Sequence, residues 1–166
     1  MKTRYLVVGL VFAVLAVCQA LAAPSADQTF VATVGQVGML EVEAGKLAES
    51  KSSNADVKKF GHHMIEDHTR LGDELKKLAA SNGFTFPTDM GPTNRKALDA
   101  LAAKSGKAFD QAYATAMVSG HEGAVQLFEN TAKTAQDPEL KAWASSSLPV
   151  IKDHLKMARE LARKVK

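Results

Sequence analysis

The sequence predicts an all-α protein, a ferritin-like four-helix bundle with a long connection between its second and third long helices. Two observations support this fold. Apolar residues recur every three or four positions along four long segments, and no stretch shows the strict alternation of a strand. The first and last connections between the long segments are short, so each pair they join should be antiparallel, whereas the middle one is long enough to cross the bundle, as in ferritin-like folds.

The helix ends carry recognisable signals. Ser53 or Asn54 can cap the second helix, Gly83 follows its end, and Asp137 followed by Pro138 starts the fourth. Thr93 to Lys104 should form a short extra helix inside the long connection. Pro149 lies within the fourth helix and should kink or strain one turn. The long helices are expected over Asp27–Glu49, Ala55–Ser81 and Lys107–Ala135, and from Asp137 onward.

The N-terminal residues are typical of an export signal. Lys2 and Arg4 precede an apolar run over residues 6–17, which is too short to span a bilayer comfortably. A small-x-small pattern ends at Ala22, so residues 1–22 are predicted to be a signal peptide and residues 23–166 the bundle domain. The alternative is a lipoprotein anchor at Cys18, whose preceding valine is large for such a signal. The expected location is the periplasm or the outer cell envelope.

The charge of the chain excludes some partners. Removing Lys2 and Arg4 with the leader lowers the net charge from +3 to +1, and no basic stripe with interleaved aromatic residues is present. We therefore expect no nucleic-acid binding. The mature chain is expected to contain no transmembrane segment. Whether the protein binds an envelope partner or forms a homo-oligomer stays open.

An internal repeat joins the second and fourth helices. Residues 64–75 and 150–161 are identical at five of twelve positions, and the match centres on Asp67-His68 and Asp153-His154. This pattern predicts two helix pairs related by a pseudo-two-fold axis. Chance similarity between two helices rich in Ala, Leu and Lys is the alternative.

Each long helix places an ionisable residue near the middle of its apolar stripe: Glu41, His68, His121 and His154. A buried imidazole or carboxylate must be hydrogen-bonded, paired or bound to a metal. Three imidazoles and a carboxylate suit a single transition metal ion such as Zn, Cu or Fe. The alternative is a metal-free Glu/Asp–His network that fixes the helix register.

Other acidic residues lie close to this layer in the sequence. A carboxylate that holds the far nitrogen of a ligating histidine is the usual support of a metal site. We expect this role from two aspartates and regard two glutamates as reserve ligands, namely Asp67, Asp153, Glu43 and Glu122.

A standard di-iron centre is disfavoured. Such centres use Glu-x-x-His on two helices, and here Ile65 and Ile151 stand where the glutamates should be. His62 and His63 are expected on the surface, with His63 able to pair with Asp67 one turn later.

Several motifs together resemble one family of exported bacterial proteins, the domain of unknown function 4142. They occur in order along the mature chain and include Glu41-Val42-Glu43-x-Gly45-Lys46-Leu47-Ala48, Met64-x-x-Asp67-His68, Phe109-Asp110-x-x-Tyr113, Met117-Val118-x-x-His121 and Leu148-Pro149-x-x-x-x-His154-Leu155. The resemblance implies a ferritin-like fold and a periplasmic or outer-envelope location, but it supplies no function. Its motif positions include the four residues of the polar layer and Asp67.

Two functions are therefore open. The first is an exported metal-binding protein with a redox or stress-protective role. The second is a non-catalytic structural or partner-binding bundle. An enzyme that uses the Asp-His pairs is disfavoured, because neighbours such as Asp67 and His68 diverge by about 100° round a helix, and whether the protein is an enzyme stays uncertain.

Overall fold

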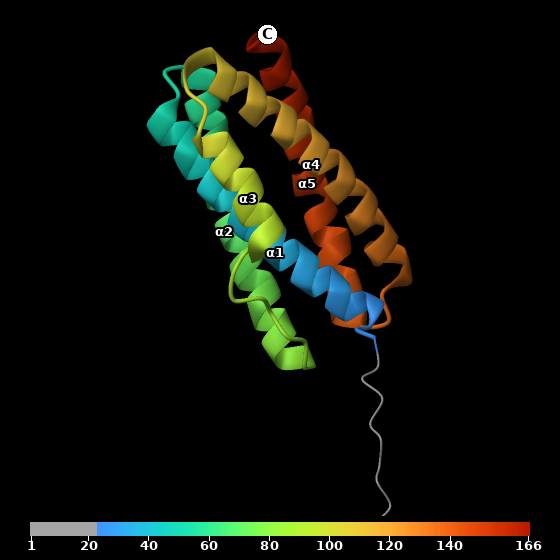
Figure 1. Cartoon of the computed structure of the whole chain (residues 1–166). Helices are drawn as coiled ribbons and strands as arrows, with labels where there is room; N and C mark the ends of the chain where they lie inside the picture. Colours follow the sequence, from blue (N-terminus) through green and yellow to red (C-terminus); the bar gives the residue numbers. More distant parts are fainter. Residues whose placement is uncertain (1–22) are drawn as a thin grey trace, which may run out of the picture.

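The computed structural model describes residues 23–166, which form a four-helix bundle and one extra helix (Figure 1). The predicted all-α fold class is confirmed. The predicted signal peptide, with Cys18 and the cleavage point at Ala22, lies outside the described residues. The helices are α1 (Ala26–Lys51), α2 (Ala55–Asn82), α3 (Gly91–Ala102), α4 (Gly106–Thr134) and α5 (Pro138–Lys164).

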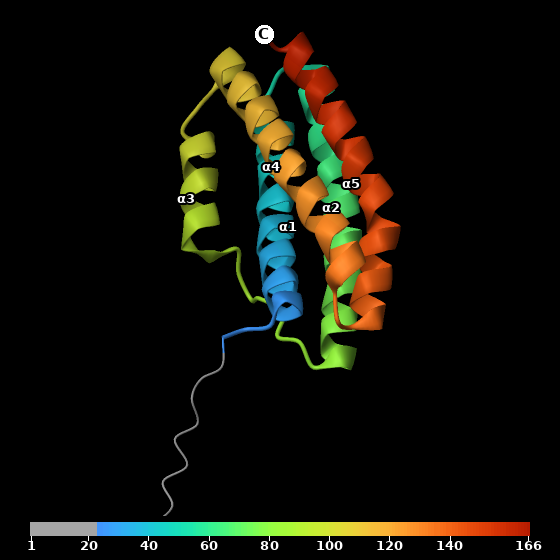
Figure 2. The ribbon, with the colours of Figure 1, turned by 90° about the vertical axis from the view of Figure 1, so that its right-hand side faces the viewer.

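The bundle consists of two antiparallel pairs. Helix α1 packs along α2, and α4 packs along α5, while α3 lies outside the bundle against α1 (Figure 2). The connection that contains α3 returns the chain along the bundle, so α2 and α4 run in the same direction (Figures 1 and 2). This is the predicted crossover. Among the described residues, no helix is both long and apolar enough to cross a membrane.

Local capping chemistry explains the helix ends. The Asn54 side chain accepts hydrogen bonds from the first turn of α2, and the Asp137 side chain accepts one from Leu140 N at the start of α5. Gly83 ends α2 with a φ of 74°, which favours glycine. The observed bounds lie within two residues of the predicted ones. Helix α5 continues through Pro149.

The apolar core is divided into two clusters. One contains Met64, Phe109 and Tyr113, and the other is built around Phe30 and Phe128, whose rings meet edge to face 5.2 Å apart. The residues that separate the clusters along each long helix are the predicted polar layer, Glu41, His68, His121 and His154. The bundle therefore interrupts its core at the level of these side chains.

Two glycines set the close approach of α1 and α2. A Cβ added at Gly45 would lie 2.7 Å from the carbonyl oxygen of Gly61, and one added at Gly61 would lie 2.9 Å from the carbonyl oxygen of Gly45. Only glycine fits at both positions without moving a backbone. This contact fixes α2 against α1 two turns before His68 and so helps to place that side chain.

Candidate metal centre

Three histidines meet at the centre of the bundle. His68 comes from α2, His121 from α4 and His154 from α5, and one ring nitrogen of each lies within 4.8 Å of the other two. Their ring centroids are 5.2 to 5.7 Å apart. His121 and His154 are buried, and His68 is half-buried. Residues that are far apart in the sequence thus form one compact nitrogen cluster.

Hydrogen bonds fix the orientation of two of the rings. His121 Nδ1 lies 2.9 Å from the carbonyl oxygen of Met117, so Nδ1–H donates and Nε2 keeps its lone pair. His154 Nε2 lies 3.0 Å from Asp67 Oδ2, which leaves Nδ1 as the free nitrogen when Nε2–H donates. His121 Nε2, His154 Nδ1 and His68 Nε2 are all buried without a partner. Each ring therefore offers one unused nitrogen.

Burial keeps these imidazoles neutral. It lowers the pKa of His68 to about 3 and that of His121 to about 4, and the neighbouring histidines oppose protonation of both. Burial also lowers the pKa of His154, although the Asp67 carboxylate opposes the shift. The neutral form of imidazole is the one that binds metals. At neutral pH no proton has to leave any of the three rings.

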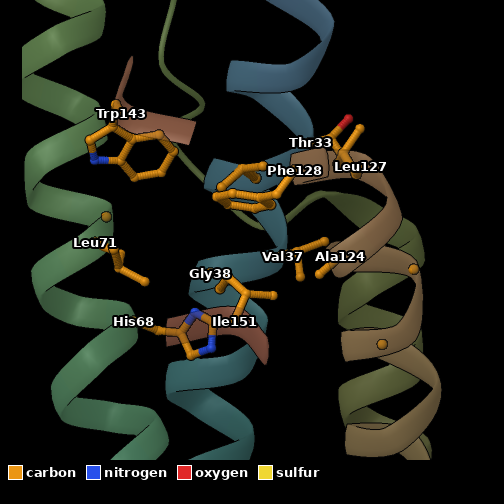
Figure 3. A pocket seen from close by; sticks show the side chains of 14 residues that line it. Thr33, Val37, Gly38, His68, Leu71, Ala124, Leu127, Phe128, Trp143 and Ile151 are labelled. Carbon is orange, nitrogen blue, oxygen red and sulfur yellow. The ribbon is translucent and has the colours of Figure 1, made fainter. Parts of the chain in front are cut away.

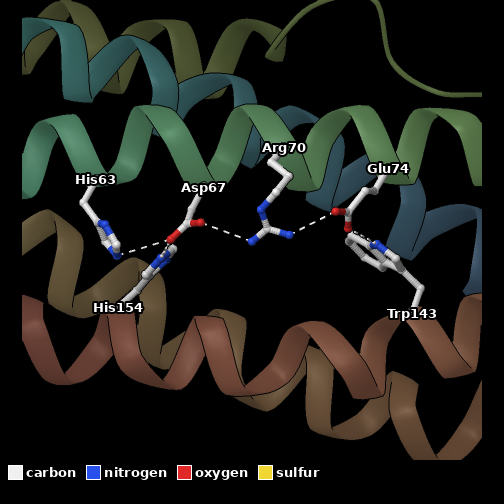
Figure 4. Close-up of polar contacts among 6 residues, drawn as sticks. All are labelled: His63, Asp67, Arg70, Glu74, Trp143 and His154. Atoms are coloured by element: carbon white, nitrogen blue, oxygen red, sulfur yellow. Dashed lines mark hydrogen bonds and ion pairs between the residues drawn. The ribbon is translucent and has the colours of Figure 1, made fainter.

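Asp67 lies outside the three-histidine cluster and contacts it through His154. Its Oδ2 accepts from His154 and lies 3.2 Å from His63 Nε2, while Oδ1 accepts from Arg70 at 3.1 Å (Figure 4). Burial would raise the pKa of Asp67, but the hydrogen bonds from His154 and Arg70 outweigh it and lower this pKa. The carboxylate is therefore ionised and orients His154. A supporting role for Asp67 and its pairing with His63 were both predicted from the sequence.

The chain of polar contacts continues beyond Asp67. Arg70 Nη1 donates to Glu74 Oε1 at 3.0 Å, and Trp143 Nε1 donates to Glu74 Oε2 at 3.2 Å (Figure 4). This row ties α2 to α5 on both sides of the bundle centre. This row was not predicted from the sequence, although the spacing of Asp67, Arg70 and Glu74 by three and four residues is a signal for it.

Glu41 is buried on α1 and is not part of the histidine cluster. The residue is 4% exposed, and its Oε2 is buried without a partner. Its Oε1 faces Gly120, where an added Cβ would lie 3.4 Å away. Burial raises the pKa of Glu41 to about 8, so the carboxyl group is protonated at neutral pH. The ligand cluster formed by the described residues contains the three histidines without Glu41, whose role as a ligand stays a prediction.

The other three acidic candidates have different surroundings. Glu43 pairs with Lys46 at 2.7 Å, Glu122 pairs with Arg159 at 2.7 Å, and Asp153 is exposed on α5. The two Asp-His pairs of the repeat are therefore not equivalent in their contacts. No described contact links these three carboxylates to the histidine cluster, and their supporting role stays a prediction.

A second group of possible ligands lies next to the first. His63, Asp67 and His154 each offer an atom within 4.8 Å of the others, and this group shares His154 with the three-histidine cluster. Its ring contact is between His63 and His154, whose centroids are 5.5 Å apart. Asp67 and His63 are only half-buried, so this group faces water more than the inner one does.

Fold and site together define a class: a helical bundle whose core contains a cluster of neutral, partly unpartnered histidines. Within that class, the chain belongs to the family called "Domain of unknown function (DUF4142)", whose family model matches residues 13–161. The family resemblance seen in the sequence is thereby confirmed. No curated protein matches the chain.

Solved structures confirm the fold. One is a DUF305 protein from Streptomyces coelicolor, described as secreted, with 14% identity, a TM-score of 0.71, and coverage of 87% of this chain and 96% of that one. Another is CopM in its Cu(II)-bound form, with 20% identity, a TM-score of 0.70, and coverage of 84% and 97%. A DUF305 fragment from Deinococcus radiodurans is 14% identical, with a TM-score of 0.67 and coverage of 85% and 98%.

Proposed function

We propose that the protein is an exported binding protein for a single transition metal ion, held by His68, His121 and His154, with Cu(II) preferred over Zn(II). The observation that carries the proposal is the convergence of three histidines whose free ring nitrogens are buried without a partner. Leaving buried polar atoms unsatisfied is costly. A metal ion would satisfy all three nitrogens at once.

The chemistry of the donor set favours copper and zinc. Neutral imidazole suits both ions, and Cu(II) binds nitrogen sites more tightly than the other divalent ions of its row. Asp67 supplies the carboxylate that orients His154, and the Met117 carbonyl does the same for His121. The Cu(II)-bound form of CopM, a protein of the same fold, also supports copper.

The proposed role is protective binding in the periplasm or outer envelope. The predicted signal peptide supports export, and a DUF305 protein of the same fold is described as secreted. The bundle encloses the ligand nitrogens. A metal held there would be kept from reacting with other envelope components, which is a stress-protective function.

Elemental analysis of the protein tests the proposal. The chain is purified from the periplasm without a histidine tag, loaded with copper, and freed of weakly bound metal by gel filtration. The wild type should retain a single copper ion per chain, and His121→Phe should retain none. His62→Phe is the matched control, because His62 is exposed and outside the cluster.

The same experiment distinguishes the alternative of a layer that only fixes the fold. Equal, negligible copper in the wild type and in His121→Phe would refute metal binding. If His121→Phe also melts at a higher temperature than the wild type, the layer acts in fold specification, since an apolar ring then fills the site better than the imidazole does.

A further inference from the structure

A cavity of about 290 Å³ lies beside the histidine cluster, next to the apolar cluster that contains Phe30 and Phe128. All four long helices line it, and its walls are almost entirely apolar (Figure 3). His68 is the one ionisable residue in its lining. The larger apolar side chains of the lining are Leu71, Leu127, Phe128, Trp143 and Ile151.

Glycines create this space. Gly45 and Gly61 are required by the close contact of two helices, but a Cβ added at Gly38, Gly72 or Gly123 would meet nothing within 4 Å. All three of these glycines line the cavity. Glycine is less stable than alanine inside a helix, so neither helix propensity nor close packing accounts for the three positions. Gly123 is exposed, but at the half-buried Gly38 and Gly72 the lack of a side chain leaves the cavity open.

The cavity also has a route to the surface. Gly38, His68 and Gly72 line both the cavity and a more polar hollow, which lies between α1, α2 and the connection that contains α3. Two of the three shared residues have no side chain that could block passage. The cavity and the hollow therefore meet at these three residues.

We propose that this cavity binds a small uncharged aromatic alcohol, a phenol or a naphthol, with its ring against Phe128 and Trp143 and its hydroxyl group on His68 Nδ1. An engineered apolar cavity of about 150 Å³ binds benzene, so a cavity of about 290 Å³ has room for one or two fused rings. Trp143 donates its Nε1–H to Glu74, so its indole nitrogen is already satisfied.

The polar end of the cavity determines the functional group of the ligand. His68 Nε2 is shielded from small molecules, so a ligand in the cavity meets Nδ1, the other nitrogen of the one ionisable side chain in the lining. A hydroxyl group can donate to Nδ1 or accept from it, whichever tautomer is present. A carboxylate or an ammonium group would lose its hydration among apolar walls without gaining a counter-charge. The ligand is therefore neutral. This site goes beyond metal binding, because it requires only the metal-free protein.

The experiment uses the intrinsic fluorescence of Trp143, the only tryptophan of the chain. Metal-free protein is titrated with 4-bromophenol, whose bromine quenches an indole in contact with it. The wild type should show saturable quenching. The matched probe 4-bromotoluene has a methyl group in place of the hydroxyl and should bind roughly three- to tenfold more weakly, the worth of a single hydrogen bond.

Substitutions at one glycine locate the site. Gly72→Leu fills the cavity and should weaken 4-bromophenol binding by at least about tenfold, whereas Gly72→Ala, the matched control, should change it by less than about threefold. If Gly72→Leu does not fold, Gly38→Leu replaces it. His68→Phe should remove the preference for 4-bromophenol over 4-bromotoluene.

Two results would overturn the proposal. One is the absence of saturable quenching in wild-type protein that melts cooperatively. The other is equal binding to the wild type and to a folded leucine variant, which would place the probe elsewhere on the protein. Since every titration uses metal-free protein, both results are independent of whether the histidines bind copper.

Discussion

Glu41→Gln should stabilise the metal-free protein at neutral and alkaline pH. The carboxyl group of Glu41 is buried, and burial raises its pKa from 4.5 to about 8. Between these values the unfolded chain has released the proton while the folded chain still holds it, so the wild type loses stability as pH rises. Glutamine has nearly the shape of a protonated glutamate and has no proton to release, so it should escape this loss.

The size of the effect follows from the two pKa values. Each unit of pH between them costs the wild type about 1.4 kcal/mol of unfolding free energy. The advantage of Glu41→Gln should therefore grow by on the order of 3 kcal/mol between pH 5 and pH 8. The histidines titrate in both proteins, so their contribution cancels in the difference.

Urea unfolding at half-unit steps of pH, in the presence of a chelator, measures this difference. Glu43→Gln is the matched control: it makes the same chemical change two residues away, at a side chain that is 42% exposed and pairs with Lys46. Its profile should stay parallel to that of the wild type. A parallel profile for Glu41→Gln would show that Glu41 is ionised in the folded protein and would refute the reasoning.

Three further predictions use other parts of the site. The pKa values of His68 and His121 in the folded protein lie below the unfolded value of 6.5, so the folded state resists protonation. Acidification from pH 6.5 to 4.5 should therefore lower the free energy of unfolding, measured in urea, by about 1.4 kcal/mol per pH unit for each ring. A flat profile would contradict the burial of these rings. Gly61→Ala should lower the free energy of unfolding by about 2 kcal/mol, because the new Cβ would clash with α1. Gly72→Ala should raise it by about 0.5–1 kcal/mol, so calorimetry should show shifts of opposite sign in the melting temperature. Asp67→Asn should weaken copper binding about 10- to 100-fold in a competition titration, since His154 loses its orienting carboxylate; unchanged affinity would exclude that role.

The helices were predictable because their signals are local. The Asn54 and Asp137 caps and the glycine at position 83 act within a few residues of the chain, so the sequence carries them directly. The histidine layer was also accessible, since a residue in the middle of an apolar stripe must face the core. Two aspartates, Asp67 and Asp153, were expected as its partners, but which carboxylate reaches His154 depends on the rotation of α2 against α5, so the sequence could not choose between them.

The cavity could not be predicted from the sequence. Gly61 and Gly72 are eleven residues apart on the same helix and look alike in the sequence. At Gly61 the backbone of α1 fills the space where a side chain would lie, and at Gly72 nothing does. Only the placement of the neighbouring helices separates the two cases. Whether a small residue marks a contact or a void is a property of the tertiary structure.

The neutrality of the histidines leads to a last test of the site as a whole. At pH 5.5 an exposed imidazole with a pKa near 6.5 loses about tenfold in metal affinity to proton competition, so a site of three exposed imidazoles would lose about a thousandfold. In the present site burial holds the pKa values of His68 and His121 at about 3 and 4, and lowers that of His154. Copper affinity measured against a chelator of known protonation should therefore change by less than about tenfold between pH 7.5 and 5.5. A thousandfold decrease would mean that copper displaces protons from the imidazoles that hold it, and would refute binding by three buried neutral rings.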